Sequence, residues 1–303
     1  MTDFHPSDAN MLARRAFDEI QIEERLISSG IPSLDFDLFG KRFKTPIMTP
    51  AFSHLPVYGE GRANGMIEYA RAAKALGAVN WVGMCENPDY REIAAVGAET
   101  IRIVKPYADL GKIRDQIRFA EEVGSLAVGI DIDHSFSGAG KADLVVGETM
   151  TCLSADQIAD FVSSTRLPFI LKGVLSARDA RLALDAGCRG VVVSHHHGRL
   201  PYAVAPITVL PSIRKEVGNG LKLFVDCSVD RGADAFKAVA LGADAVSVGR
   251  ALWPALQAEG EKGLCGYIER MNDELRMCMA FTSCRKLSDA EPSMLWKNGV
   301  QMG

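Results

Sequence analysis

Short apolar runs alternate with amphipathic stretches from about residue 45 onward, and this alternation limits the folds open to the chain. Eight of the runs are mostly apolar and rich in Val, Ile or Phe, as expected of strands buried on both faces. They are Pro46–Ala51, Ala78–Gly83, Ile101–Lys105, Leu126–Asp131, Pro168–Lys172, Gly190–Ser194, Lys222–Asp226 and Ala243–Gly249. The pattern predicts a parallel sheet whose strands are buried on both sides.

The stretches between these runs carry apolar residues at helical spacing. In Gly65–Leu76, for example, Met66, Tyr69, Ala73 and Leu76 fall on one face. Ser154 and Ser176 stand in N-cap positions, and glycine follows the ends of several stretches. The other predicted helices are Ala108–Val123, Ser154–Thr165, Ala177–Ala186, Pro206–Val217, Gly232–Leu241 and a long closing helix, Gly260–Phe281.

Alternating strands and helices in units of about 20–30 residues predict an α/β fold, a (β/α)8 TIM barrel. We expect one domain over residues 1–303, with a lead-in segment at 1–44, the barrel and closing helix at 45–287 and a tail at 288–303. The rival fold is an open doubly wound sheet, which normally carries GxGxxG after its first strand. The nearest approach, GEGRANG at Gly59–Gly65, has its third glycine one residue too late.

Composition excludes several classes of protein. The 34 basic and 38 acidic residues among 303 give a formal charge of −4, which argues against a nucleic-acid surface. No apolar run approaches the roughly 20 residues that span a bilayer, and the polar N-terminus does not resemble a secretory signal, so we expect a cytoplasmic protein. The seven cysteines lack CxxC spacing and no Cys/His quartet is apparent, which predicts reduced thiols and no metal site.

The carboxyl ends of the strands face the active site in a barrel of this kind, so polar residues there are the candidate functional residues. These ends hold Ala51–His54, Gly83–Cys85, Lys105 and Tyr107, Asp131, Asp133 and His134, Lys172, Ser194–Arg199, Asp226–Ser228, and Gly249 with Arg250.

The last two strand-to-helix loops, Asp226–Asp234 and Ser247–Trp253, form the strongest local pattern. Each places Gly or Ser and an arginine just ahead of a helix, where backbone N–H groups and a guanidinium bind anions. Barrels commonly bind phosphate at these two loops, so we predict a phosphate site. The alternative is that Gly249 only caps a strand and that Arg250 is a solvated charge.

Two further segments carry candidate residues. Lys172 ends an apolar strand, where burial is costly unless the ammonium group faces an anion or reaches solvent. His195, His196 and His197 follow another buried strand, but neighbours on an extended segment point to opposite sides, so one metal ion can hardly take all three. A general base with Arg199 nearby for a substrate anion is the better interpretation, and a solvated polar loop is the alternative.

Taken together, four segments resemble the FMN-dependent 2-hydroxy-acid oxidase and dehydrogenase family. ILKGVLSARDARLALDAG is similar to its strand-five lysine segment, and SHHHGR to its S-N-H-G-x-R motif. FVDCSVDRGADAFKAVALGADAVSVGR is similar to its phosphate segment, and MAFTSCRKL to the end of its closing helix. The resemblance is close over Pro168–Leu287 and weaker, though alignable, from Ala16 to Asp131.

The resemblance implies roles for individual residues. Lys172 would lie by flavin N1, His196 would be the catalytic base, and Asp131 would hold the His196 imidazole. Arg199 would grip the substrate carboxylate, and Tyr107 would contact the substrate. The implied cofactor-binding residues are Ala51, Lys105, Lys172, Ser194, Asp226, Ser228, Arg231, Gly249 and Arg250.

The sequence departs from the family pattern at several of these places. In the phosphate loop, Cys227 and Ser228 replace two glycines, and Asp230 replaces the first arginine. The N-terminal substrate tyrosine and the second substrate arginine have no counterpart, and the loop after strand four is short. The other replacements are Lys105 for a glutamine, Gly83 and Gly129 for hydroxyl residues, and His195 and His197 for Asn and Gly.

The implied function is that of an FMN-dependent oxidoreductase acting on a 2-hydroxy acid or a related hydroxylated small molecule, with electrons passing to flavin N5. Because the carboxylate clamp is weakened, two alternatives stay open. One is a flavin enzyme without net oxidation, similar to type 2 isopentenyl diphosphate isomerase; the other is a non-catalytic barrel that binds a phosphorylated ligand or a protein partner. The expected partners are a small-molecule substrate and an electron acceptor that the sequence does not identify, and the family suggests a homo-oligomer, a tetramer.

Overall fold

The computed structural model describes residues 8–303, so the expectation of a non-secretory N-terminus rests mostly on residues outside those described. Each predicted strand is confirmed, with shifted ends. The barrel strands are β4 (Ile47–Met48), β5 (Asn80–Val82), β6 (Thr100–Val104), β7 (Ala127–Asp131), β10 (Phe169–Val174), β11 (Gly190–Val193), β12 (Lys222–Val225) and β13 (Ala245–Ser247).

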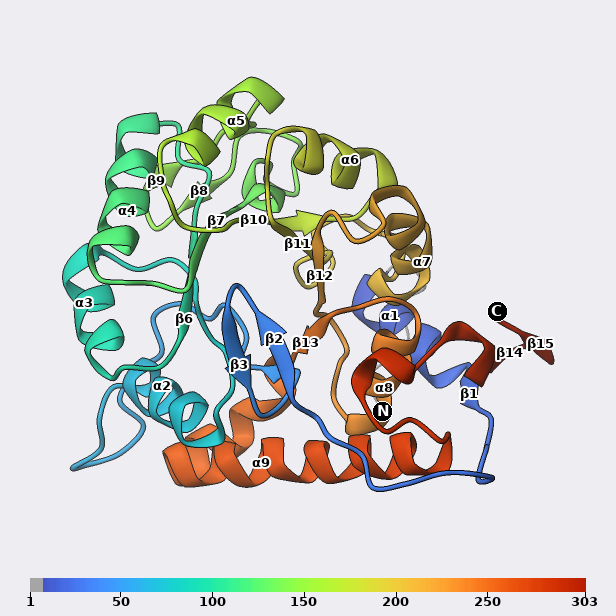
Figure 1. Ribbon diagram of the computed structural model, residues 1–303. Helices are drawn as coiled ribbons and strands as arrows, with labels where there is room; N and C mark the ends of the chain where they lie inside the picture. The colour runs from blue at the N-terminus through green and yellow to red at the C-terminus, as the bar shows by residue number, and fades with distance from the viewer. Residues whose placement is uncertain (1–7) are drawn as a thin grey trace.

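These strands form one parallel sheet that closes on itself, with helices around its outside (Figure 1). Their order is β4-β13-β12-β11-β10-β7-β6-β5. Beyond the two end strands, the Thr49 amide N, just after β4, donates to the Val79 carbonyl O, just before β5, at 3.3 Å. The fold is therefore the predicted TIM barrel, and its strand ends point to one mouth.

The predicted helices are also present around the sheet. They are α2 (Gly65–Leu76), α4 (Leu110–Glu122), α5 (Ala155–Ser163), α6 (Ala177–Asp185), α7 (Pro206–Val217) and α8 (Gly232–Ala240). Ser154 and Ser176 cap α5 and α6, since their hydroxyl groups accept from the third backbone N–H of each helix. The closing helix α9 (Trp253–Phe281) begins earlier than predicted, and Gly260, the predicted start, is a break within it, with φ 59°.

Several short elements were not predicted. Helix α1 (Ala9–Asp18) precedes the barrel, and α3 (Asn87–Ala95) lies between β5 and β6. Strand β1 (Ile20–Ile22) pairs antiparallel with β14 (Leu295–Lys297), which pairs with β15 (Val300–Gln301) and ties the two ends of the described chain together. The loop after β7 holds the 3-10 helix η1 (Ile132–His134) and a small hairpin of β8 (Leu144–Val145) and β9 (Glu148–Thr149).

A further hairpin, β2 (Phe36–Leu38) with β3 (Lys41–Phe43), crosses the centre of the barrel in Figure 1. Its Leu38 and Phe43 side chains pack with interior side chains of the strands such as Trp81, Ile103 and Phe224. Because β4 begins directly after this hairpin, the hairpin closes the end of the barrel opposite the mouth. Within residues 8–303, no helix combines the length and the apolar character needed to cross a bilayer.

Candidate active site

A cavity of about 420 Å³ opens at the mouth of the barrel, a volume ordinary for a small-molecule site. It is lined by Lys172 on β10, by residues that follow β4, β11, β12 and β13, and by Asn10 of α1. Seven of the residues proposed from the sequence line it: Ala51, Lys172, His196, Asp226, Ser228, Gly249 and Arg250.

The remaining proposed residues lie elsewhere. Ser194 and Arg199 line a second cavity of about 610 Å³ between the loops that follow β7, β10 and β11. Lys105 and Asp131 are buried and line neither cavity. Tyr107 is fully buried and Arg231 is exposed, and neither lines these cavities.

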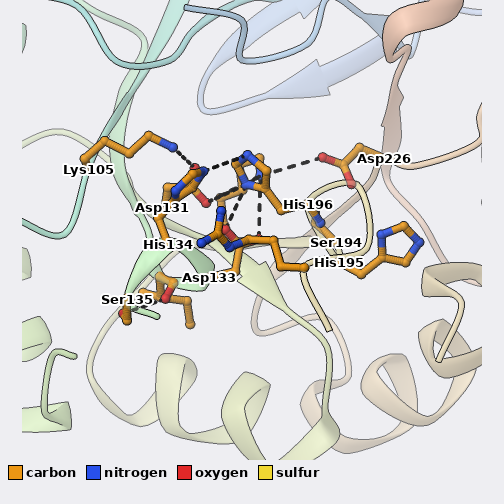
Figure 2. Close-up of polar contacts among 12 residues, drawn as sticks. Lys105, Asp131, Asp133, His134, Ser135, Ser194, His195, His196 and Asp226 are labelled. Atoms are coloured by element: carbon orange, nitrogen blue, oxygen red, sulfur yellow. Dashed lines mark hydrogen bonds and ion pairs between the residues drawn. The ribbon is translucent and has the colours of Figure 1, made fainter. Parts of the chain in front are cut away.

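A buried ionic network joins the ends of three neighbouring strands (Figure 2). Lys105 Nζ at the end of β6 lies 2.7 Å from Asp131 Oδ2, and Lys172 Nζ on β10 lies 3.4 Å from Asp131 Oδ1. Burial alone would favour a neutral carboxyl, but the ammonium groups of Lys172 and Lys105 hold the pKa of Asp131 well below its ordinary value. Asp131 is therefore an ionised carboxylate in the site.

His196 lies against this network through its Nδ1 atom. That atom is 3.0 Å from Lys172 Nζ, 3.3 Å from Asp131 Oδ1 and 2.8 Å from Asp133 Oδ1. Burial and the Lys172 ammonium group oppose charge on the ring, but Asp131 and Asp133 outweigh them, and the pKa of His196 is raised. The site thus stabilises the protonated imidazole, the state that a general base reaches after it takes a proton.

Asp133 is a second carboxylate beside His196, which the sequence placed at a strand end but gave no role. Both of its oxygens are buried, and neither accepts a hydrogen bond of good geometry from the described residues. Burial, together with the neighbouring charge of Asp131, raises the pKa of Asp133 to about 6. Gly173, at a bulge in β10 with φ 92°, makes room for it, since a Cβ there would lie 2.6 Å from the Asp133 carboxyl.

The other ring nitrogen of His196 faces His134. The two Nε2 atoms are 2.9 Å apart, and His134 Nδ1 lies 3.1 Å from Asp143 Oδ2. Arg199 Nη2 donates to the same Asp143 oxygen at 2.6 Å and to the Phe136 carbonyl O at 2.6 Å. The sequence missed Asp143 because only the folding of the short loop after β7 brings it to the mouth.

Four of these residues, Asp131, Asp133, His134 and His196, place ligand-type atoms within 4.8 Å of one another. Such a cluster has the composition of a metal site. In this protein, however, the Lys105 and Lys172 ammonium groups lie against Asp131 and balance its charge. The geometry favours an acid–base network.

The far side of the cavity has the features of an anion cradle. The backbone N–H groups of Ser228, Gly249 and Arg250 have no hydrogen-bond acceptor within residues 8–303. The Arg250 guanidinium has one hydrogen bond there, to Asn10 Oδ1 at 3.4 Å, which is weak. Free N–H groups and an arginine ahead of a helix suit a phosphate, although the carboxylate of Asp230 also lines the cavity.

The loops after β11 and β12 hold residues with left-handed backbone. His196 and His197 have φ 44° and 63°, and Cys227 and Ser228 have φ 66° and 64°. Such angles cost residues with a Cβ of order 1 kcal/mol or more, and they cluster at functional sites. Cys227 and Ser228, which stand where the pattern resembled by the sequence has two glycines, thus keep a conformation that glycine adopts readily.

Helix α1 covers this end of the cavity, which the sequence did not predict. Arg14 forms a two-point ion pair with Asp234, with both contacts at 2.7 Å, and donates to the Ser228 carbonyl O at 2.8 Å. Asn10 lines the cavity itself and donates to the His197 carbonyl O at 2.9 Å. Helix α1 therefore contacts both the loop after β11 and the loop after β12.

Comparisons with known proteins find similar chains and structures. The chain matches the FMN-dependent dehydrogenase family over residues 8–152 and 145–297. It is 30% identical over 322 residues to a glycolate oxidase of Spinacia oleracea, covering 92% of this chain and 85% of that protein. A mandelate oxidase variant solved with (S)-mandelic acid has a TM-score of 0.86 at 28% identity, covering 97% of this chain and 90% of that one. A mandelate oxidase variant solved with a C4a-OH-FMN adduct has a TM-score of 0.87 at 28% identity, covering 98% and 93%.

Proposed function

This chain belongs to the FMN-dependent dehydrogenase family, and from that premise we propose that it oxidises a 2-hydroxy acid, or a related hydroxylated small molecule, at the mouth of its barrel. One observation carries the proposal. Lys172 and His196, from two neighbouring strand ends, line one cavity and lie in contact, with Nζ 3.0 Å from Nδ1.

The residues present fit the cofactor of the family, FMN. The phosphate would be held by the free N–H groups of Ser228 and Gly249 and by Arg250. Lys172, whose pKa is raised by Asp131, Asp133 and Asp226 in spite of burial, would place a positive charge beside the ring. When bound, FMN supplies the acceptor for the electron pair that leaves the substrate.

His196 would take the hydroxyl proton of the substrate. Asp131 and Asp133 would stabilise the resulting imidazolium, since both lie within 3.3 Å of Nδ1. The proton would then go to Nε2, the nitrogen that His134 contacts in this structure. A positioned base of this kind contributes roughly 10²–10⁴-fold to the rate. Tyr107, which the resemblance assigned to substrate contact, would need to move from its fully buried place to take part.

Anaerobic reduction of the bound flavin tests the proposal. We expect the purified protein to bind FMN, and a panel of 2-hydroxy acids and related alcohols to bleach its visible absorbance in the absence of oxygen. A protein that binds no FMN would contradict the proposal and favour a barrel that binds only a phosphorylated ligand. Conversion of a phosphorylated alcohol without an electron acceptor would favour the non-redox alternative.

We also propose a homotetramer in the cytoplasm, as the family resemblance and the sequence suggest. Leu26, Ile27 and Ile31, in the segment after β1, are exposed apolar side chains, and such side chains are commonly covered in oligomers. Light scattering of the FMN-loaded protein tests the oligomeric state: a monomer at micromolar concentration would contradict it. Fractionation of the native cell tests the location.

A further inference from the structure

The loop after β7 places two of its own side chains where a 2-hydroxy acid would bind. Arg199 is the residue to which the resemblance assigns the substrate carboxylate, and His196 is the proposed base. In this structure the Asp143 carboxylate already accepts a hydrogen bond from Arg199, and the His134 imidazole already contacts His196.

The hydrogen-bond directions in this chain follow from the acceptors. Although burial works against it, His134 and Arg199 hold the pKa of Asp143 below its ordinary value, so its ionised carboxylate can only accept. His134 must therefore carry a proton on Nδ1 to reach Asp143, and as a neutral ring it has a free lone pair on Nε2. His196 must in turn carry a proton on Nε2 to reach His134. In this structure Nε2 of His196, the nitrogen that would take the substrate proton, therefore donates its own proton to His134.

His134 is neutral because of its surroundings. Burial and the positive charges of Lys105, His196 and Arg199 outweigh Asp131 and lower the pKa of His134 to about 3. Its ring meets that of His196 edge to face, with centroids 4.2 Å apart.

The Nη2 group of Arg199 is not free for two-point binding of a second anion, although its Nε group has no partner among the described residues. Its Nη2 atom donates both to Asp143 and to the Phe136 carbonyl O, each at 2.6 Å. Two-point binding of a substrate carboxylate needs two adjacent guanidinium N–H groups, and one of them is already occupied. The side chain is only about a quarter exposed, so water does little to weaken the pair.

The backbone around Asp143 is fixed rather than free. The Asp143 amide N donates to the Ser135 carbonyl O at 3.2 Å, and the Asp143 carbonyl O accepts from the Met150 amide N at 2.9 Å. The adjoining β8–β9 hairpin is tied to the loop after β6 by the bond from the Ala108 amide N to the Thr149 carbonyl O at 2.8 Å. Asp143 is therefore held against Arg199 by its own loop, and a substrate must displace the side chain.

From this geometry we propose that Asp143 is a specificity-determining residue that competes with the substrate carboxylate for Arg199 and, through His134, with the substrate hydroxyl for His196. The proposal rests on the proposed function, because it takes Arg199 and His196 as the groups that bind substrate. As a consequence, simple 2-hydroxy carboxylates should bind weakly. The protein should prefer substrates that bind Arg199 more strongly than a single carboxylate does.

The test measures carboxylate binding without turnover, with oxalate as the probe, a two-carbon dicarboxylate that has no carbinol to oxidise. Oxalate is titrated into the FMN-loaded protein and followed by the flavin spectrum and by calorimetry. In Asp143→Asn, which keeps the shape but removes the charge, we expect oxalate to bind roughly tenfold to hundredfold more tightly than in the wild type. Glu148→Gln, on the adjoining β8–β9 hairpin, is the matched control and should leave the affinity unchanged.

A second variant separates competition from a structural effect. Arg199→Gln should bind oxalate weakly, and adding Asp143→Asn to it should restore nothing, because both changes act through one pair. With 2-hydroxy acids, Asp143→Asn should lower KM while kcat changes little, a gain that damage to the fold does not produce.

Equal oxalate affinity in the wild type and Asp143→Asn, or a loss of affinity in the variant, would overturn the proposal. A gain that persists equally in the Arg199→Gln background would also overturn it, because the effect would not pass through Arg199. Failure of every hydroxy acid to reduce the flavin would instead count against the proposed function, which this binding measurement does not require.

Discussion

Lys105 and Asp131 form a buried ion pair across the adjacent strands β6 and β7, with Nζ 2.7 Å from Oδ2 and both side chains less than a tenth exposed. Lys105→Met removes one partner and leaves the Asp131 carboxylate with Lys172 and His196. We expect a loss of about 3 kcal/mol in the free energy of unfolding, the lower end for breaking a buried pair. Urea denaturation measures it.

Lys222→Met is the matched control for Lys105→Met. Lys222 pairs with Asp244 at 2.8 Å, but its side chain is 41% exposed, so we expect a loss below about 1 kcal/mol. Equal small losses in the two variants would show that the Lys105 pair adds nothing to stability.

His196→Asn should slow anaerobic reduction of the flavin by roughly 10²–10⁴-fold, since it removes the proposed base. FMN should stay bound, because the phosphate end of the cavity is untouched. Stopped-flow absorbance measures both properties. The control is His195→Asn, which introduces the family residue beside it; in Figure 2 the His195 ring lies apart from the ionic network, and we expect little change. Unchanged rates in His196→Asn would remove this residue from the role.

Asp230→Asn should tighten FMN binding. The Asp230 carboxylate lines the cavity at the phosphate end, and Arg14 lies only 3.6 Å from it as a partial counter-charge. Removing a like charge should raise the affinity about fivefold to tenfold, or about 1–1.4 kcal/mol. Fluorescence titration of the apoprotein measures it, and the gain should shrink in 1 M salt. Asp273→Asn, an exposed residue of α9, should change nothing, and an equal gain there would refute the explanation.

The stability of the protein should fall less steeply with acid in His134→Gln than in the wild type. The pKa of His134 is about 3 in the folded protein, against 6.5 for an ordinary histidine. The unfolded chain therefore binds a proton below about pH 6.5 that the folded chain refuses, so this residue costs stability as pH falls from 6.5 toward 3.

Urea denaturation between pH 7 and 4 measures this effect as the difference between variant and wild type, because Asp133, with a pKa of about 6, acts in the opposite direction in both. His54→Gln, at an exposed position, is the control. Parallel curves for the wild type and His134→Gln would contradict the prediction.

The barrel was predictable because its strands are apolar on both faces and its helices carry strong caps. Helix α3 was missed because only Tyr90 and Ile93 of its nine residues are buried, too few to produce a helical period. Helix α1 buries mostly alanines, Ala9, Ala13 and Ala16, which a search for large apolar residues overlooks. The β2–β3 hairpin and the β1–β14 pair are set by contacts distant in sequence.

The residues of the candidate site also fall into a group that the sequence predicts and a group that it does not. Lys172, His196 and Arg250 follow from position at strand ends, because the fold fixes where those ends meet. Asp143 reaches the mouth through the folded loop after β7, and Asn10 through the packing of α1. Neither position could be predicted from the spacing of nearby residues in the sequence. The pairing of Arg199 with Asp143 could not be predicted, since Arg199 and Asp143 are 56 residues apart.

The position of α1 has a consequence for biosynthesis. Arg14 and Asn10 lie 214 and 240 residues ahead of their partners Ser228 and Arg250 in the chain. During synthesis the helix cannot meet these partners until both loops have been translated, so the cradle for the cofactor tail is completed only then. Loading of the prosthetic group is thereby deferred until both loops are present, and a truncated product that lacks them is expected not to retain it.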